Sequence, residues 1–170
     1  MKGGKVVEGI WSSLAWGLVA NSVSLLSLEC RDICYKGELV IDNIFKHSLH
    51  KCEENEKFLT RFYEHFLATS PRVTEKFVNT DFERQKEALR LSLRMMAMAS
   101  VESDAADTYL EYIAKRHDRH HLNIEPELYE LWLEALIDTV RECDNEFDAE
   151  VEQAWRSVLR YGINYMISHY

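Results

Sequence analysis

The most conspicuous candidate for chemistry is a histidine-rich stretch over residues 116–121, which reads Arg-His-Asp-Arg-His-His. His117 and His121 are four positions apart, so on a helix both imidazoles would share one face, and imidazole is a common ligand of transition metals. The same residues also suit the end of a helix, where cationic side chains interact favourably with the negative end of the helix dipole. The stretch alone leaves a metal site and a polar helix end both open.

The sequence lacks the residues that several other kinds of catalytic site require. All six glycines lie at positions 3, 4, 9, 17, 37 and 162. Residues 38–161 therefore cannot form a P-loop or a dinucleotide-binding loop, because both need glycine where the backbone approaches phosphate. The sequence has no Gly-x-Ser-x-Gly motif, and no cysteine lies beside an obvious base. Cys30 and Cys34 could form a redox pair or half of a metal site, but the four scattered cysteines also fit ordinary reduced thiols of a cytoplasmic protein.

The charge balance of the chain argues against nucleic acid as a partner. The 170 residues include 20 Lys and Arg and 29 Asp and Glu, which gives a formal net charge of −9. Residues 101–156 alone hold sixteen acidic and five basic side chains. Such a chain would repel a phosphate backbone.

Residues 9–28 contain no charged side chain, and this segment has several possible interpretations. The segment is long enough to cross a bilayer, and Lys2 and Lys5 in front of it resemble the basic start of a signal peptide. Its serines lower the hydropathy, however, and small residues form a stripe along one helical face: Ser13, Gly17, Ala20, Ser24 and Ser27. We therefore expect an N-terminal extension over residues 1–37 with an extra helix used for packing or homodimer formation. Membrane insertion and a start site assigned too early are the alternatives.

From residue 38 onward the chain has the pattern of an all-α domain that extends to residue 170. Without glycine, tight β-hairpin turns are hard to build. Apolar residues recur at helical spacing and predict six helices with short connections. Local signals mark several helix boundaries: Ser70-Pro71 ends the second helix, Thr80 and Glu83 form a capping box, and Pro126 and Asp148 open the last two helices.

Short motifs run through this domain in a fixed order. They are Phe62-Tyr63, Pro71, Phe77, Gln85 with Leu89, Ile113-Ala114-x-x-His117 and Pro126-Glu127-x-Tyr129. Their order and spacing resemble those of the bacterial globins, in particular the single-domain and flavohaemoglobin-type proteins, over residues 39–168. The resemblance implies a globin-like helical fold that binds a b-type haem.

The resemblance also implies the residues of the proximal haem pocket. His117 would be the ligand of the haem iron, Phe77 would pack on the porphyrin face, and Tyr129 would lie in the proximal pocket and support the histidine. The chain departs from the family pattern in one respect, because it has two more residues between the histidine and the Pro-Glu-x-Tyr motif. His120 and His121 therefore remain alternative iron ligands.

On the distal side, the resemblance implies that Tyr63 and Gln85 form a polar pair and that Leu89 forms the apolar wall. In nitric-oxide-dioxygenating relatives such a pair is catalytic. Bound dioxygen carries partial negative charge, so a phenol O–H and an amide N–H that point at it slow its dissociation.

These residues lead us to expect a haem protein that reversibly binds dioxygen or another diatomic gas, such as nitric oxide or carbon monoxide. Oxygen transport would be one use of such binding. It would also carry out nitric oxide detoxification if it receives electrons. The chain ends at Tyr170 without a flavin or nicotinamide domain, so turnover would need an external reductase, and whether the protein is an enzyme stays open. One alternative is a gas or redox sensor that signals through the N-terminal helix, and another is a haem-free globin-fold interaction module.

Overall fold

The structure is a computed structural model that describes residues 37, 39–99 and 104–170. Residues Leu39–Tyr170 form one compact unit. The expected N-terminal helix, its small-residue stripe and the Cys30–Cys34 pair lie outside the described residues. All regular structure in the described part is helical, as predicted. None of its helices is long and apolar enough to cross a membrane.

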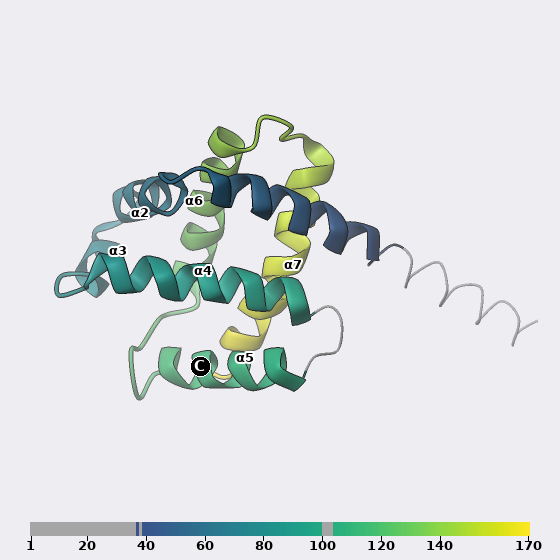
Figure 1. The fold of residues 1–170 in the computed structure, drawn as a ribbon. Helices are drawn as coiled ribbons and strands as arrows, with labels where there is room; N and C mark the ends of the chain where they lie inside the picture. The colour runs from purple at the N-terminus through teal and green to yellow at the C-terminus, as the bar shows by residue number, and fades with distance from the viewer. Residues whose placement is uncertain (1–36, 38, 100–103) are drawn as a thin grey trace, which may run out of the picture. The chain divides into compact units, whose positions relative to one another are not determined.

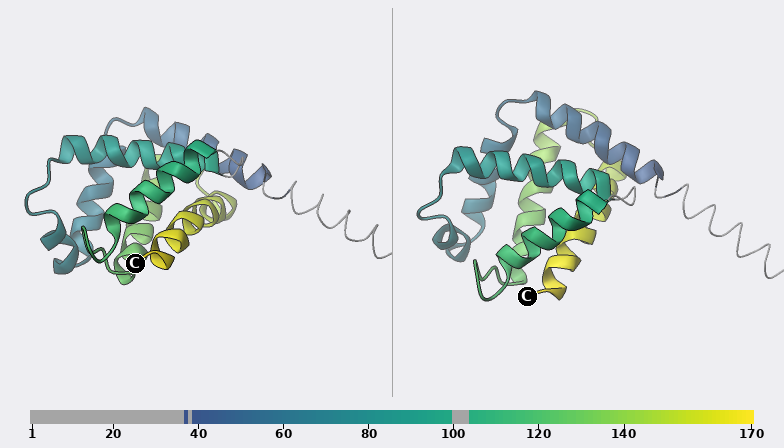
Figure 2. Two further views of the ribbon diagram at one scale, coloured as in Figure 1. Left: turned by 90° about the horizontal axis from the view of Figure 1, so that it is seen from below. Right: turned by 60° about the horizontal axis from the view of Figure 1, so that its bottom comes forward.

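The described part of the chain contains seven helices (Figure 1). The first covers residues 39–54, and the others are α2 (Phe58–Thr69), α3 (Pro71–Lys76), α4 (Phe82–Ala99), α5 (Asp104–His117), α6 (Glu127–Cys143) and α7 (Ala149–Ser168). Helices α6 and α7 run alongside each other, α4 crosses them, and α5 packs against α4 and α7 (Figures 1 and 2).

The helix that the sequence pattern missed is α3. Ser70 ends α2 in an extended conformation and also caps α3, since its side chain accepts a hydrogen bond from the Arg72 backbone N–H at 3.2 Å. Pro71 occupies the first turn, where a missing N–H has no cost. The Ser70-Pro71 pair therefore both stops one helix and starts the next.

The start of α4 differs from the expected capping box. The carboxylate of Asp81, rather than the hydroxyl of Thr80, caps this helix, because Asp81 Oδ1 accepts hydrogen bonds from the backbone N–H groups of Glu83 and Arg84 at 3.1 and 3.3 Å. The carboxylate also interacts favourably with the positive end of the helix dipole. The prediction placed the helix start correctly but chose the wrong cap.

Trp155 on α7 lies at the centre of the core and is fully buried. Its ring meets Phe45 edge to face at a centroid distance of 4.6 Å and Phe58 at 6.5 Å. Its indole N–H donates to the hydroxyl of Ser48 at 2.9 Å. Ser48 is buried as well, so this hydrogen bond satisfies two polar groups that water cannot reach. The contact fastens the helix 39–54 to α7.

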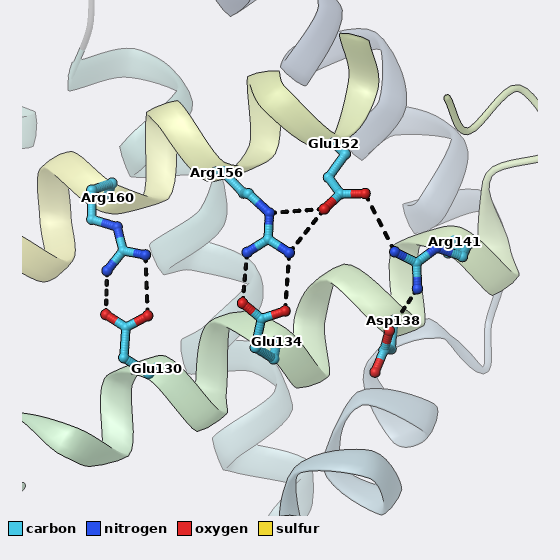
Figure 3. Close-up of polar contacts among 7 residues, drawn as sticks. All are labelled: Glu130, Glu134, Asp138, Arg141, Glu152, Arg156 and Arg160. Atoms are coloured by element: carbon cyan, nitrogen blue, oxygen red, sulfur yellow. Dashed lines mark hydrogen bonds and ion pairs between the residues drawn. The ribbon is translucent and has the colours of Figure 1, made fainter. Parts of the chain in front are cut away.

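A ladder of ion pairs joins the outer faces of α6 and α7 (Figure 3). Arg160 pairs with Glu130, and Arg156 pairs with Glu134 through two hydrogen bonds of 2.6 and 2.9 Å. Glu152 accepts from Arg156 at 2.9 Å. Since residue numbers rise along one helix as they fall along the other, these pairs fix the antiparallel register of α6 and α7.

Replacing Ser48 with alanine tests the core hydrogen bond. The Trp155 indole N–H would then be buried without a partner, so we expect Ser48→Ala to lower the free energy of unfolding by about 1–3 kcal/mol in urea denaturation. Ser157→Ala, at an exposed position of α7, is the matched control and should change stability by less than about 0.5 kcal/mol. Equal losses in the two variants would contradict the role of this contact.

The ladder should contribute less than the core. Its side chains are partly exposed, so Arg156→Gln should cost no more than about 1 kcal/mol, and the difference from wild type should shrink in about 1 M NaCl because salt screens the pairs. Thermal unfolding at low and high salt measures this. A loss of stability that salt leaves unchanged would mean that Arg156 acts through packing instead.

Candidate functional site

His117 is the last residue of α5 and lies on the inner face of that helix, half-buried. Its Nδ1 atom is 2.8 Å from the backbone oxygen of Ile113, one turn earlier. A carbonyl oxygen can only accept, so Nδ1 carries the proton and Nε2 keeps its lone pair. Nε2 has no hydrogen-bond partner in the described residues. Burial lowers the pKa of His117, the hydrogen bond to Ile113 opposes this in part, and the nearby Arg116 lowers the pKa further, so the ring is neutral at pH 7.

The loop after α5 holds the end of the helix in place. The backbone N–H groups of Leu122 and Ile124 donate at 3.0 Å to the oxygens of Arg116 and His117, which satisfies carbonyls that the helix leaves without partners. Asn123 between them has a φ of 49°, a left-handed conformation that asparagine tolerates better than most residues.

The two alternative histidines lie in this loop, outside the helix. Both His120 and His121 are exposed. The ring Nδ1 of His121 is 2.8 Å from a carboxylate oxygen of Asp118, which also accepts from the backbone of His120. Because α5 ends at His117, His117 and His121 do not share a helical face as the sequence spacing suggested.

Contacts from two other elements anchor the same loop. Lys76 of α3 donates to the backbone oxygen of Asn123 at 2.6 Å, and the Tyr170 hydroxyl donates to the Asn123 side chain at 2.8 Å. Arg119 donates to the backbone oxygen of Tyr170 at 2.8 Å and lies over its ring. Sequence analysis missed Lys76, Asn123 and Tyr170, because these contacts join residues about fifty positions apart.

Tyr129 lies beside His117, as expected for a residue of the same pocket. The centroids of the two rings are 6.5 Å apart. Tyr129 is buried, and burial raises its pKa to about 12, with a smaller contribution from Tyr170. His117 Nδ1 donates its hydrogen bond to the Ile113 carbonyl rather than to the Tyr129 hydroxyl, so the contact between Tyr129 and the histidine is one of ring packing.

The predicted distal residues come together where α2 packs on α4. Tyr63 of α2 is buried, and its hydroxyl donates to the backbone oxygen of Gln85 at 3.4 Å. This long distance describes a weak hydrogen bond. Burial raises the pKa of Tyr63, so the phenol keeps its proton and remains a donor. Leu89, one turn after Gln85 on α4, is buried as well.

Aromatic rings surround Tyr63. Phe77 lies 5.9 Å and Phe82 5.4 Å from its ring, both edge to face, and Phe77 and Phe82 stack at 6.1 Å. Sequence analysis predicted Phe77 as a pocket residue but did not single out Phe82. Its position directly after the capping residue was the available signal, since it places an apolar side chain in the first turn of α4.

The helices that carry the two halves of the site face each other. Met96 of α4 and both Tyr109 and Ile113 of α5 line an apolar cavity of about 20 Å³, together with Gly162 of α7. Ile113 thus borders this cavity with its side chain and holds His117 with its carbonyl. Of the predicted site residues, Tyr63, Leu89 and Tyr129 belong to one hydrophobic core cluster, and Phe77 packs against it.

The donor set fits haem better than a free metal ion. One axial position of a haem iron requires a single neutral imidazole with a free lone pair, surrounded by aromatic and aliphatic side chains. His117 meets this requirement. The described residues contain no group of three or more His, Cys, Asp or Glu side chains that could hold a metal ion. The sequence left two interpretations of residues 116–121 open, a metal site and a polar helix end. A metal ion held between His117 and His121 is the less suitable of the two.

Comparison with known proteins identifies the family. The Globin family model matches residues 60–166. Among solved structures, the chain is similar to protein PA3967 from Pseudomonas aeruginosa PAO1, which is described as structurally highly homologous to a human hemoglobin. The two share 38% sequence identity, the match covers 76% of this chain and 98% of that chain, and the TM-score is 0.74. Curated protein sequences give no match.

The chain therefore belongs to the globin family. This confirms the globin-like all-α fold and the resemblance to bacterial single-domain globins that the motifs predicted.

The lowered pKa of His117 predicts a pH dependence of stability in the protein without cofactor. Its ordinary value is 6.5, so below about pH 7 the unfolded chain binds a proton that the folded chain does not, and acidification favours unfolding. We expect His117→Leu to lose less stability than wild type between about pH 7 and pH 5, measured by urea denaturation. His120→Leu, at an exposed histidine, should keep the wild-type dependence. If it does not, the effect cannot be assigned to His117.

Proposed function

We propose that this globin binds a b-type haem through His117 and uses it to bind a diatomic gas reversibly. The observation that carries the proposal is the state of the His117 ring, which is neutral, held at Nδ1 by Ile113 and free at Nε2. When bound, the haem iron would supply reversible coordination of dioxygen, nitric oxide or carbon monoxide. The free cysteines Cys52 and Cys143 suit a reducing compartment, and we place the protein in the cytoplasm.

The proximal residues would hold and tune the cofactor. The hydrogen bond from Nδ1 to the Ile113 carbonyl orients the imidazole and raises its basicity, which strengthens its donation to a metal at Nε2. Tyr129 would exclude water on this side of the pocket. Phe77 and Leu89 would provide apolar surface for the macrocycle.

The distal residues would determine what happens to the gas. Tyr63 donates weakly to the backbone of Gln85, so its hydroxyl could exchange this 3.4 Å hydrogen bond for a stronger one to a partly negative ligand. The Gln85 amide would be the second donor. On this basis we propose nitric oxide dioxygenation, with electrons from a separate reductase, as the finer function.

Visible spectroscopy tests the haem-binding proposal. Protein loaded with haem should show a Soret band that shifts when dithionite reduces it and shifts again with carbon monoxide. His117→Ala should abolish this axial coordination, whereas His120→Ala and His121→Ala should leave the spectra unchanged. A chain without a Soret band after haem reconstitution would support the haem-free interaction module instead.

Distal variants test the finer function. Each hydrogen bond to a partly charged ligand is worth roughly 1.5–3 kcal/mol, so Tyr63→Phe and Gln85→Leu should each speed dioxygen dissociation by about tenfold or more in stopped-flow measurements. Both variants should also slow nitric oxide consumption at saturating reductant. Wild-type consumption no faster than that of free haem would refute dioxygenation and leave gas binding intact.

A further inference from the structure

Helix α5 has two faces with different properties. Its inner face carries Leu110, Ala114 and His117, all at least partly buried. Its outer face carries Tyr112 and Lys115 together with Arg116, and all three are exposed. Because an α-helix with its side chains is about 10 Å across, this outer face lies about one helix diameter from the His117 ring.

Lys115, Arg116 and Arg119 lack the carboxylate partners that most arginines in the described part of the chain have. Carboxylates pair with most arginines in the described residues: Arg61, Arg72, Arg90, Arg94, Arg141, Arg156 and Arg160. In the same part of the chain, Lys115, Arg116 and Arg119 form no ion pair with a side-chain carboxylate. Asp118, which lies between them in sequence, is engaged by His121. Arg116 donates to the Tyr112 hydroxyl and Arg119 to the backbone oxygen of Tyr170, so no side-chain carboxylate among the described residues neutralises the charge of these three cations.

The position of these cations is unusual for an acidic chain. Residues 101–156 contain only five basic residues against sixteen acidic ones, and three of the five are Lys115, Arg116 and Arg119. A short positive patch surrounded by negative charge attracts an acidic molecule in one orientation and repels it in others.

Exposed apolar side chains lie beside these cations. Tyr112 is 54% exposed and Leu122 is 50% exposed. Arg116 donates to the Tyr112 hydroxyl at 3.1 Å, and its guanidinium lies 5.7 Å from the ring centroid. Tyrosine and arginine are the residue types that most often dominate binding energy at protein interfaces. We call Tyr112, Lys115, Arg116, Arg119 and Leu122 the outer α5 surface.

We propose that the outer α5 surface is a docking site for an acidic electron-donor protein. The electron-transfer part rests on the proposed haem function. The reduced donor would lose one electron, the ferric cofactor would gain it and become ferrous, and no atom or proton would need to move. The shortest protein path between donor and cofactor would run through α5 to His117.

An acidic protein fits this surface better than other anionic partners. Nucleic acid and anionic membranes present extended negative charge, which the rest of this acidic chain would repel. A small acidic protein can match the patch alone and cover its two exposed apolar side chains.

Binding can be measured without haem. Oxidised flavodoxin, an acidic flavoprotein, is added at low salt to the full-length 15N-labelled chain, and amide chemical shifts are followed. We expect shifts centred on Tyr112–Leu122 that vanish at high salt and in the double variant K115E/R116E. The control K57E/R61E reverses two charges on and before α2 and should bind as wild type does. Absence of binding, or shifts centred elsewhere, would overturn the proposal, as would stronger binding of a short DNA duplex or of phosphatidylglycerol vesicles at the same residues.

Reduction kinetics test the electron-transfer part separately. Reduced flavodoxin should reduce the ferric haem-loaded chain at a rate that falls with ionic strength, and K115E/R116E should lower that rate at least tenfold at low salt. The single variant K115E, which leaves Arg116 beside His117 in place, should also lower that rate, and its carbon monoxide binding after reduction by dithionite should be unchanged, which shows that the pocket is intact. An unchanged reduction rate with an intact Soret band would overturn electron entry at this surface but leave the haem proposal standing. A chain that does not bind haem at all would refute the proposed function and, with it, electron transfer at this surface. The NMR binding experiment would still test docking independently.

Discussion

The hydrogen bond between His117 and the Ile113 carbonyl is the interaction on which the candidate site depends. The acceptor is a backbone carbonyl one turn earlier in α5, and the bond leaves the other ring nitrogen free. The geometry lasts only if α5 ends at His117. The loop after α5 enforces that end by donating backbone N–H groups to the last two helical carbonyls, and Lys76 and Tyr170 hold the loop from outside.

The rest of the fold places other residues around this point. The Trp155–Ser48 contact and the ion pairs between α6 and α7 fix the frame that carries Tyr129. Packing of α2 on α4 brings Tyr63 to the start of α4, beside Gln85, in a cluster of aromatic rings. Each half of the site therefore depends on a different helix pair, and the site is complete only when both pairs have formed.

Local signals explain which features the sequence could predict. Helical periodicity and the absence of glycine over residues 38–161 were enough for the all-α class, and Asp148 marked the start of α7, where its side chain caps the helix. Helix α3 was missed because six residues are too few to show a period, although Ser70-Pro71 carried the signal. Thr80 and Asp81 are neighbours, and both residue types can cap a helix. The sequence alone therefore does not decide between them, because the choice depends on the path of the backbone at the start of α4.

The candidate site followed mainly from the order of motifs along the chain. Composition alone could not choose among His117, His120 and His121, since the choice depends on where α5 ends, and that end is set by contacts with Lys76 and Tyr170 far away in sequence. For the same reason, the partner of His117 Nδ1 could not be predicted. A carbonyl acceptor one turn earlier is available at most helical positions, and the exposed His169 uses one as well, since its Nδ1 lies 2.7 Å from the Tyr165 oxygen.

The most direct test of the central claim is nitrogen NMR of the chain labelled with 15N-histidine, recorded as haem is added in the ferrous, carbon-monoxide-bound form. Among the seven histidines, we expect the Nε2 resonance of His117 to undergo the large shift of a metal-bound nitrogen while its Nδ1 stays protonated. A ligand shift at His120 or His121, with His117 unchanged, would contradict this expectation.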